Sequence, residues 1–256
     1  MPCFNEEASL PHLKEKLAAL REVCCDGWQL DFVFVNDGST DATAAILDEW
    51  RIADGRVRVV THPTNRGLGA ALSSGFAAAE GDYVAALDCD CTYDPLMLPG
   101  MLEALDEETD VLTGSEFHPE GHVVGVNAMR LLFSRTMCLM YRWLFWTRIH
   151  SFSCLLRVYR RDVLATLPIR SRGFLSCTEI LVRALAAGYR VREFPVTLTA
   201  REHGESKIPV VRTIFDHLFF MARMRLALWF GPRQAKAEAV DVEAVQSPVG
   251  SMSGTA

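Results

Sequence analysis

Two aspartates separated by a single residue follow an apolar run in the first half of the chain, in the order Leu87-Asp88-Cys89-Asp90. Carboxylates at positions i and i+2 that leave a strand can bind one divalent ion between the protein and a diphosphate. Hard oxygen ligands and a phosphate partner suit Mg²⁺ or Mn²⁺. Solvated turns are also rich in aspartate, so the position of this pair after an apolar run is what favours a metal site.

A second acidic motif, Asn36-Asp37-Gly38-Ser39-Thr40-Asp41, follows an earlier apolar run. Ligands of open α/β sheets bind at the carboxyl ends of the strands. An aspartate at such an end can accept hydrogen bonds from a ribose hydroxyl or from a base. The two motifs together therefore indicate a nucleotide-binding edge.

The elements that must position these residues alternate between strand and helix. Strands are predicted at residues 31–36, 57–61, 83–88 and 111–114, with helices at 43–53, 68–79 and 95–103 between them. The strands are continuously apolar, which is typical of parallel strands covered on both faces. We expect a doubly wound, mostly parallel α/β sheet with flanking helices.

The second half of the chain continues with longer helical patterns. A helix is predicted at 125–144, a pair of strands at 153–159 and 191–200, and a helix between them at 177–187. The chain opens on the loop that should follow a first strand, so we expect that strand to be missing and the natural start to lie upstream. Residues 233–256 lack aromatic anchors and are predicted to be disordered.

Composition narrows the possible functions. The 256 residues carry a net charge of -6, and the pI near 5.7 argues against a nucleic-acid binder. The eight cysteines show no zinc-type spacing, which favours free thiols in a reducing compartment.

No secretory signal and no uninterrupted apolar stretch of membrane-spanning length is present. Residues 208–230 are apolar but are interrupted by charges such as Arg212, Asp216 and Arg223. They could form an amphipathic helix in a lipid headgroup region, or a helix packed on the rest of the protein or at a dimer contact. Residues 126–146 have the same character.

Five segments, in order, resemble the motifs of one enzyme family. Pro2-Cys3-Phe4-Asn5-Glu6-Glu7 resembles P-x-Y-N-E-E, the Asp37 motif resembles D-D-G-S-x-D, and residues 65–71 resemble N-x-G-x-G-x-A. Asp88-Cys89-Asp90 with Asp94-Pro95 resembles D-x-D followed by D-P, and residues 201–207 resemble R-x-x-G-x-S-K. The chain is therefore similar to family 2 glycosyltransferases of the GT-A fold, in the dolichyl-phosphate mannose or glucose synthase branch.

The resemblance implies roles for the donor site. It places Pro2, Phe4, Glu6 and Asp37 around the nucleotide. It also implies that Asp88 and Asp90 bind the metal and the donor diphosphate, with the backbone of Cys89 beside them. Arg201 and Lys207 would act as cations that neutralise phosphate groups. Asp90, Arg201 and Lys207 would then carry the catalysis, with GDP-mannose or UDP-glucose as donor.

The resemblance also implies the acceptor and the domain limits. A polyprenyl phosphate would meet Arg130 and Ser134, which match an R-x-x-x-S-R pattern, and Arg201, Ser206 and Lys207. A phosphomonoester is already largely dianionic at neutral pH, so no general base is required. We expect residues 1–207 to form the catalytic domain and residues 208–232 the surface helix. The protein would be peripheral on the cytoplasmic face of a membrane.

Several positions depart from the family pattern around the acceptor. Glu116 stands where an arginine is usual, Ser151 where an acid is usual, and Thr92 where glutamine is frequent. These changes leave two alternatives open. The first is an enzyme that acts on a hydroxyl acceptor, with Glu179 as the general base, although Glu179 could equally be a helix cap. The second is a non-catalytic module that binds a nucleotide sugar.

Simpler interpretations apply to other charged residues. The Glu6-Glu7 pair could cap a helix, and Arg201 with Lys207 could belong to a solvated loop. We interpret the histidines without ligand spacing as surface or loop residues: His150, His203 and His217.

Overall fold

The computed structural model describes residues 1–24, 27–201 and 210–230. Its strands are β1 Pro2–Cys3, β2 Phe32–Asn36, β3 Val57–Thr61, β4 Tyr83–Ala86, β5 Val111–Ser115, β6 His122–Val124, β7 Arg157–Arg160, β8 Val191–Pro195 and β9 Thr197–Thr199. Its helices are α1 Leu10–Val23, α2 Thr43–Ala53, α3 Leu68–Ala78, α4 Leu98–Glu103 after the short 3-10 helix η1 Pro95–Met97, α5 Ala128–Phe145, α6 Arg161–Thr166, α7 Leu175–Ala186 and α8 Val210–Phe230.

The strands form two sheets that meet at β1 and β4, and a small two-stranded sheet beside them. β1, β2 and β3 are parallel in that order, and the second sheet has the order β4-β7-β5-β8. β7 is antiparallel to both of its neighbours, whereas β5 and β8 are parallel. The Cys3 and Cys89 thiols lie 2.8 Å apart between the two sheets. The predicted doubly wound, mostly parallel architecture is confirmed, with one antiparallel strand inserted.

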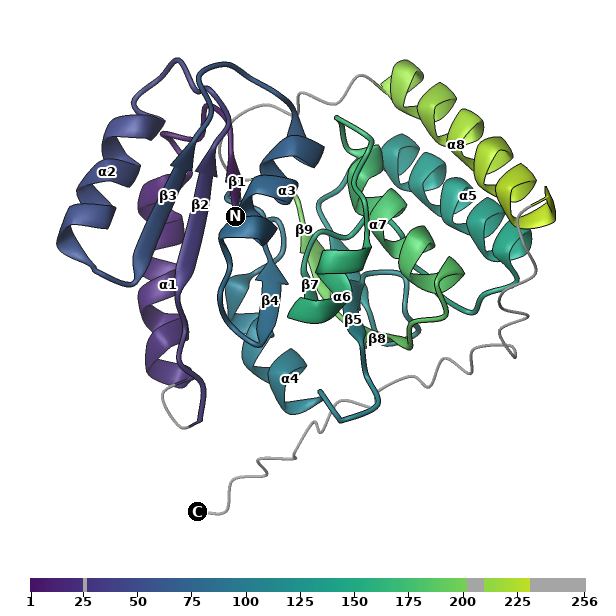
Figure 1. Ribbon diagram of the computed structural model, residues 1–256, viewed down its shortest axis with the longest axis horizontal. Coiled ribbons are helices and arrows are strands. Elements are labelled where there is room, and N and C mark those ends of the chain that lie inside the picture. Colours follow the sequence, from purple (N-terminus) through teal and green to yellow (C-terminus); the bar gives the residue numbers. More distant parts are fainter. Residues whose placement is uncertain (25–26, 202–209, 231–256) are drawn as a thin grey trace.

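Helices cover both faces of the sheets, as the apolar strands predicted. Val111 packs in a cluster with α5, α7 and α8, while the next residue, Leu112, packs in a cluster with α1 and α4. Likewise, Val158 packs in the cluster with α1 and α4, and Tyr159 packs in the cluster with α5, α7 and α8. Figure 1 shows α1 and α2 at one end of the molecule and α5, α7 and α8 grouped at the other.

The structure corrects several boundaries. The predicted first strand is not wholly missing, because Pro2–Cys3 pair with β2 as β1. The strand predicted at 83–88 ends at Ala86, since residues 87–90 turn away from the sheet into the acidic motif. The strands predicted as a pair do not pair with each other: β7 and β8 lie on opposite sides of β5. Helices α1 and α6 and strand β6 were not predicted.

Helix α8 packs against α5 and α7 along one face. Phe220, Met221 and Met224 are buried against α5 and α7, and the His217 Nδ1 lies 2.9 Å from the Tyr141 hydroxyl. The interpretation of His217 as a surface residue was wrong, because it is only 8% exposed. No helix in the described part of the chain is long and apolar enough to cross a bilayer. The tail predicted at 233–256 lies outside the described residues.

Candidate active site

Asp90 is held in place by its own turn and by a distant arginine. Its Oδ1 accepts hydrogen bonds from the Thr92 amide, at 3.0 Å, and from the Thr92 hydroxyl, at 2.9 Å. Its Oδ2 accepts one from the Arg201 Nε at 2.7 Å. Thr92, which replaces the glutamine frequent in the family, thus orients the carboxylate. Asp90 is therefore held in a fixed orientation and is not a solvated turn residue.

Asp88, two residues earlier, has no such partner. Its carboxylate makes no hydrogen bond or ion pair with any residue that the structure describes. Burial is the main cause that raises the pKa of Asp88 to about 8, and the Asp90 carboxylate beside it adds to the effect. A carboxylate in this position is stabilised when a cation lies against it.

These carboxylates fit a divalent cation that is also bound by a ligand. Asp88 and Asp90 provide hard oxygen donors of the kind that Mg²⁺ and Mn²⁺ prefer. Within the described residues, no group of three or more His, Cys, Asp or Glu side chains is arranged to hold a metal by itself. A metal bound here would therefore take its remaining ligands from a phosphate-bearing substrate and water.

Arg201 brings together two acidic residues that lie far apart in the sequence, Glu6 and Asp90. Its Nη2 lies 2.7 Å from the Glu6 Oε1 and its Nε 2.7 Å from the Asp90 Oδ2. The solvated-loop interpretation of Arg201 is therefore wrong. The Ser9 hydroxyl donates to the other Glu6 oxygen at 3.0 Å. Glu6 is thus aimed at the site by contacts on both of its oxygens.

Of the two residues Glu6 and Glu7, only Glu7 caps a helix. The Glu7 carboxylate accepts a hydrogen bond at 2.8 Å from the Ala42 amide, at the first turn of α2. Glu7 therefore secures α2, whereas Glu6 contacts Arg201 in the candidate site.

Asp37 anchors the glycine-rich segment at the neighbouring strand end. It is 3% exposed, and it accepts hydrogen bonds from the amides of Arg66, at 2.9 Å, and Gly67, at 2.7 Å. Its Oδ1 also lies 2.6 Å from the His62 Nδ1. Its predicted contact with the nucleotide stays a prediction, and the structure adds a positioning role.

The remaining donor residues surround this edge. Pro2 lies in β1, and Phe4 is half-buried directly after it. The Cys89 side chain points into the core, where its thiol contacts Cys3. That contact, and after it burial, raise the pKa of the Cys89 thiol. Only the Cys89 backbone is therefore left to meet a ligand, as the resemblance implied.

Of the predicted acceptor residues, Arg201 lies in this cluster, whereas Arg130 and Ser134 make no contact with it in the described part of the chain. Arg130 is exposed in the first turn of α5, and Ser134 is half-buried one turn later. Ser206 and Lys207, and likewise His203, lie outside the described residues.

The two family departures beside β5 contact each other. The Ser151 hydroxyl donates a 2.7 Å hydrogen bond to Glu116, which is 3% exposed and whose pKa is raised by burial. Glu193, which is 1% exposed, accepts the amides of His150 and Ser151 and lies 2.7 Å from the His150 Nδ1. His150 is thus not a free surface residue. No motif indicated this polar cluster, because its members lie far apart in sequence.

Glu179 is not available as a general base. It is 1% exposed and accepts hydrogen bonds from the amides of Arg170 and Ser171 and from the Arg183 Nε. Although burial opposes this, these hydrogen bonds lower its pKa. A carboxylate with a lowered pKa and occupied oxygens is a weak proton acceptor.

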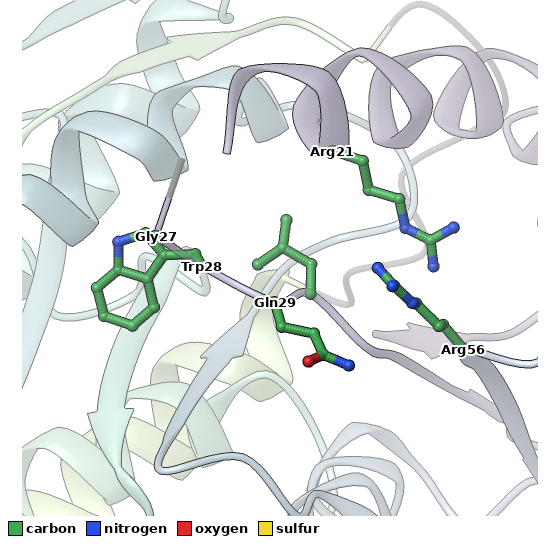
Figure 2. A pocket seen from close by; sticks show the side chains of 6 residues that line it. Arg21, Gly27, Trp28, Gln29 and Arg56 are labelled. Atoms are coloured by element: carbon green, nitrogen blue, oxygen red, sulfur yellow. The ribbon is translucent and has the colours of Figure 1, made fainter. Parts of the chain in front are cut away.

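A cavity of about 480 Å³ lies away from the acidic cluster. Figure 2 shows Arg21, Gln29 and Arg56 around it, with Trp28 at one side. Gln29 precedes β2 and Arg56 precedes β3, so the cavity is at the amino ends of these strands. Asp37 follows the carboxyl end of β2, so the cavity is separate from the candidate site.

The geometry and the motifs together define a nucleotide-sugar transferase of the GT-A type. The model of the family described as "Glycosyl transferase family 2" matches residues 1–167, and the chain belongs to that family. It is 33% identical over 215 residues to polyprenol monophosphomannose synthase of Mycolicibacterium smegmatis, covering 81% of this chain and 79% of that protein. It is 30% identical over 232 residues to dodecaprenyl-phosphate galacturonate synthase of Rhizobium johnstonii, covering 88% of this chain and 66% of that protein.

Solved structures confirm the fold. The structure is similar to glucosyl-3-phosphoglycerate synthase from Mycobacterium tuberculosis in complex with phosphoglyceric acid, with a TM-score of 0.60 and 22% identity. That match covers 89% of this chain and 76% of the other. A second structure of the same enzyme, with Mn²⁺, UDP and phosphoglyceric acid, matches with a TM-score of 0.59 and 21% identity, covering 89% of this chain and 75% of the other.

Proposed function

We propose that this glycosyltransferase moves a hexose, mannose or glucose, from GDP-mannose or UDP-glucose to a polyprenyl or dolichyl phosphate. The observation that carries the donor half is the Asp88 carboxylate, unpartnered among the described residues beside an Asp90 that is held by Arg201. The acceptor half is supported by the two relatives, whose names specify polyprenol and dodecaprenyl phosphate products.

In this mechanism, Asp88 and Asp90 hold Mg²⁺ or Mn²⁺, which when bound neutralises charge on the leaving nucleoside diphosphate. Arg201, kept beside Asp90 by Glu6, donates its N–H groups to the same phosphates. Lys207 is proposed as a second cation for donor or acceptor phosphate, with Ser206 beside it. Pro2, Phe4 and Asp37 are proposed to position the nucleotide.

The acceptor requires no base from the protein. A phosphomonoester has a second pKa of about 6 and is mostly dianionic at neutral pH. In-line attack by its oxygen on the anomeric carbon inverts the configuration of the sugar. Because the Glu179 oxygens are occupied, a saccharide hydroxyl acceptor lacks the base that it would need.

A membrane surface is the proposed place of reaction. Exposed apolar side chains gather on α5 and α8, including Trp143 at 76% exposure, Trp146 at 81% and Phe219 at 73%. Arg130 and Ser134 lie on the same α5, so the proposed acceptor residues are beside this face. The cysteines of the described residues are all free, which supports the cytoplasmic side.

A non-catalytic nucleotide-sugar module is the second candidate, because Glu116 and Ser151 replace family residues. In the structure these two side chains bond to each other, which leaves the Asp90–Arg201–Glu6 arrangement intact. The acceptor side has changed more than the donor side, and the enzyme remains the better-supported function.

The test is sugar transfer to a short polyprenyl phosphate in detergent, with GDP-mannose and UDP-glucose offered separately in the presence of Mn²⁺. Product formation that is lost in Asp90→Ala would establish the activity and identify the donor. Metal-dependent donor hydrolysis without transfer would retain the donor site and reject the acceptor. Absence of both donor binding and turnover would reject the enzyme in favour of the non-catalytic module.

A further inference from the structure

A small cavity of about 140 Å³ lies between α7 and α8, on the side of the molecule that carries the exposed aromatic residues. Figure 1 shows these two helices side by side with α5 at the end away from β3 and α2. Three arginines line the cavity, namely Arg170, Arg183 and Arg223, together with the carboxylates of Glu179 and Asp216. The described lining of the cavity therefore has more positive than negative side chains.

Two of the three arginines are free to bind an anion. Arg183 is committed, because its guanidinium contacts the Glu179 carboxylate at 2.8 Å. The exposed side chains of Arg170 and Arg223 make no hydrogen bond or ion pair with any described residue. Against these two cations stands only Asp216, which is also exposed. A guanidinium pair in this setting suits a phosphate, which arginine binds through paired N–H groups.

The apolar surroundings identify the source of that phosphate. Phe219 lines the cavity and is 73% exposed, and Phe215, one turn earlier on α8, is 68% exposed. Phe174, just before α7, is 44% exposed. A free phosphate gains nothing from exposed aromatic side chains around its site. A lipid does, because such side chains can enter the acyl boundary while the headgroup stays with the arginines.

The charge of the surrounding face points the same way. The chain as a whole carries a net charge of -6. By contrast, residues 128–148, 168–174 and 213–226 contain a single acid, Asp216, among eight arginines. Those arginines are Arg130, Arg135, Arg142, Arg148, Arg170, Arg172, Arg223 and Arg225. An acidic protein with one basic, aromatic-rich face is complementary to an anionic bilayer.

We propose that the cavity between α7 and α8 binds the phosphate of an anionic phospholipid headgroup, at a site separate from the acidic donor site. The inference rests on the proposed function, which places this face on a membrane, and adds a lipid-specific contact that the transfer reaction does not require.

The experiment is vesicle co-sedimentation of the full chain with phosphatidylcholine vesicles, with and without phosphatidylglycerol. Arg170→Gln/Arg223→Gln is compared with Arg142→Gln/Arg148→Gln, which removes the same charge from the same face outside the cavity. We expect the cavity variant to lose about tenfold or more in affinity for the anionic vesicles. The control should lose clearly less, and neither should change binding to neutral vesicles.

A variant that is expected to bind anionic vesicles more tightly distinguishes the proposed site from a loss caused by misfolding. Asp216→Asn removes the only uncommitted acid at the cavity and should increase affinity for the anionic vesicles severalfold. Equal losses in the two arginine pairs would overturn the proposal in favour of diffuse electrostatic attraction. Competition by inorganic phosphate at constant ionic strength would overturn it in favour of a site for a soluble anion.

The outcome is separable from that of the proposed function. Transfer to a short polyprenyl phosphate in detergent should be unchanged in Arg170→Gln/Arg223→Gln, because the cavity does not contact the acidic site. A parent protein that binds anionic vesicles through these arginines but transfers no sugar would reject the proposed function and keep the lipid site.

Discussion

At the scale of single residues, the candidate active site contains more acidic than basic side chains. Glu6, Asp88 and Asp90 would contribute three negative charges if all were ionised, against one positive charge on Arg201. Arg201 contacts Glu6 and Asp90 but not Asp88, whose pKa is raised mainly by burial and further by the neighbouring Asp90 carboxylate. A divalent cation would balance the remaining charge, which is the physical argument for metal dependence.

This imbalance predicts opposite stability effects for two similar substitutions. Asp88→Asn removes repulsion from a carboxylate without a partner, so it should stabilise the metal-free protein by ~1 kcal/mol or more while abolishing transfer. Asp90→Asn weakens the Arg201 contact and should destabilise it by about 1–3 kcal/mol. Urea unfolding of both variants without metal checks this. Destabilisation by both would contradict the account.

Arg201 offers a second test at the same scale. Lysine keeps the positive charge but cannot span Glu6 and Asp90 with two fixed N–H groups. Arg201→Lys should therefore lower kcat/KM for the donor by about 10²-fold or more. The control is Arg51→Lys, at a surface pair with Asp48, which should leave kcat/KM unchanged. A loss in Arg201→Lys no larger than in the control would show that charge alone suffices.

At the scale of elements, the glycine-rich turn before α3 must pass close to the segment that precedes α7. A Cβ on Gly69 would lie 1.8 Å from the Ser171 carbonyl oxygen, and the Gly69 amide donates to the Arg172 carbonyl at 3.0 Å. The segment therefore tolerates no side chain here. Glu179 holds the other side of this contact through the amides of Arg170 and Ser171.

Gly69→Ala should consequently destabilise the protein, although alanine ordinarily favours a helix by about 1 kcal/mol. We expect a loss of roughly 2 kcal/mol or more, measured by urea unfolding, because the backbone must shift. Gly55→Ala, where a Cβ would meet nothing within 4 Å, is the matched control and should change little. A neutral Gly69→Ala would mean that the two segments separate easily.

The docking of α8 should depend on pH through His217. Burial lowers the pKa of His217 to about 4, below its ordinary 6.5. Between these values the unfolded chain binds the proton and the folded protein does not, so stability falls as the pH falls. We expect a loss of about 2 kcal/mol from pH 7 to pH 5. His217→Gln should lose distinctly less over the same interval in thermal or urea unfolding; an equal loss would assign the effect to other groups.

At the scale of the whole molecule, the two proposed functions lie in different regions. The carboxyl ends of β1, β2 and β4 carry the residues proposed for the donor site, and the α5–α8 end carries most of the exposed large hydrophobic side chains of the described chain. This separation suits an enzyme whose donor comes from water and whose proposed acceptor comes from a bilayer.

Membrane attachment should therefore depend on the exposed tryptophans next to the α5 terminus. Trp143→Ala/Trp146→Ala should reduce partitioning onto anionic vesicles by about tenfold, because two aromatic side chains no longer enter the interface. Unfolding free energy should be nearly unchanged, since both side chains are largely exposed. Trp28→Ala, before β2 and outside the α5–α8 face, serves as the control in the same assay. Equal partitioning of all three proteins would place the membrane contact elsewhere.

Much of this architecture could be predicted from sequence because it depends on local pattern. The runs at β2, β3 and β5 are apolar over a strand's length, and the helices between them carry recognisable periodicity. The Asp88 and Asp90 pair was identifiable because both residues follow one strand. The motifs also placed Arg201 at the donor site, although nothing in them specified its partners.

Other features depend on residues that only folding brings together. Nothing local to β7 indicates that it enters between β4 and β5, because strand order is chosen by long-range packing. The contact between Glu116 and Ser151 and that between His150 and Glu193 span tens of residues, as does the burial of His217 against Tyr141. The sequence left Glu179 as a candidate base, and only the fold shows that its carboxylate accepts hydrogen bonds from backbone amides.

The sequence by itself thus determined the family, the fold class and the types of group at the donor site, because motif residues and periodicity are properties of neighbouring positions. Only the tertiary structure decided which carboxylate has a partner, which acid is free to act as a base, and which face of α8 remains exposed. Those properties follow from burial and from distances between remote segments, and such distances are set only when the chain packs.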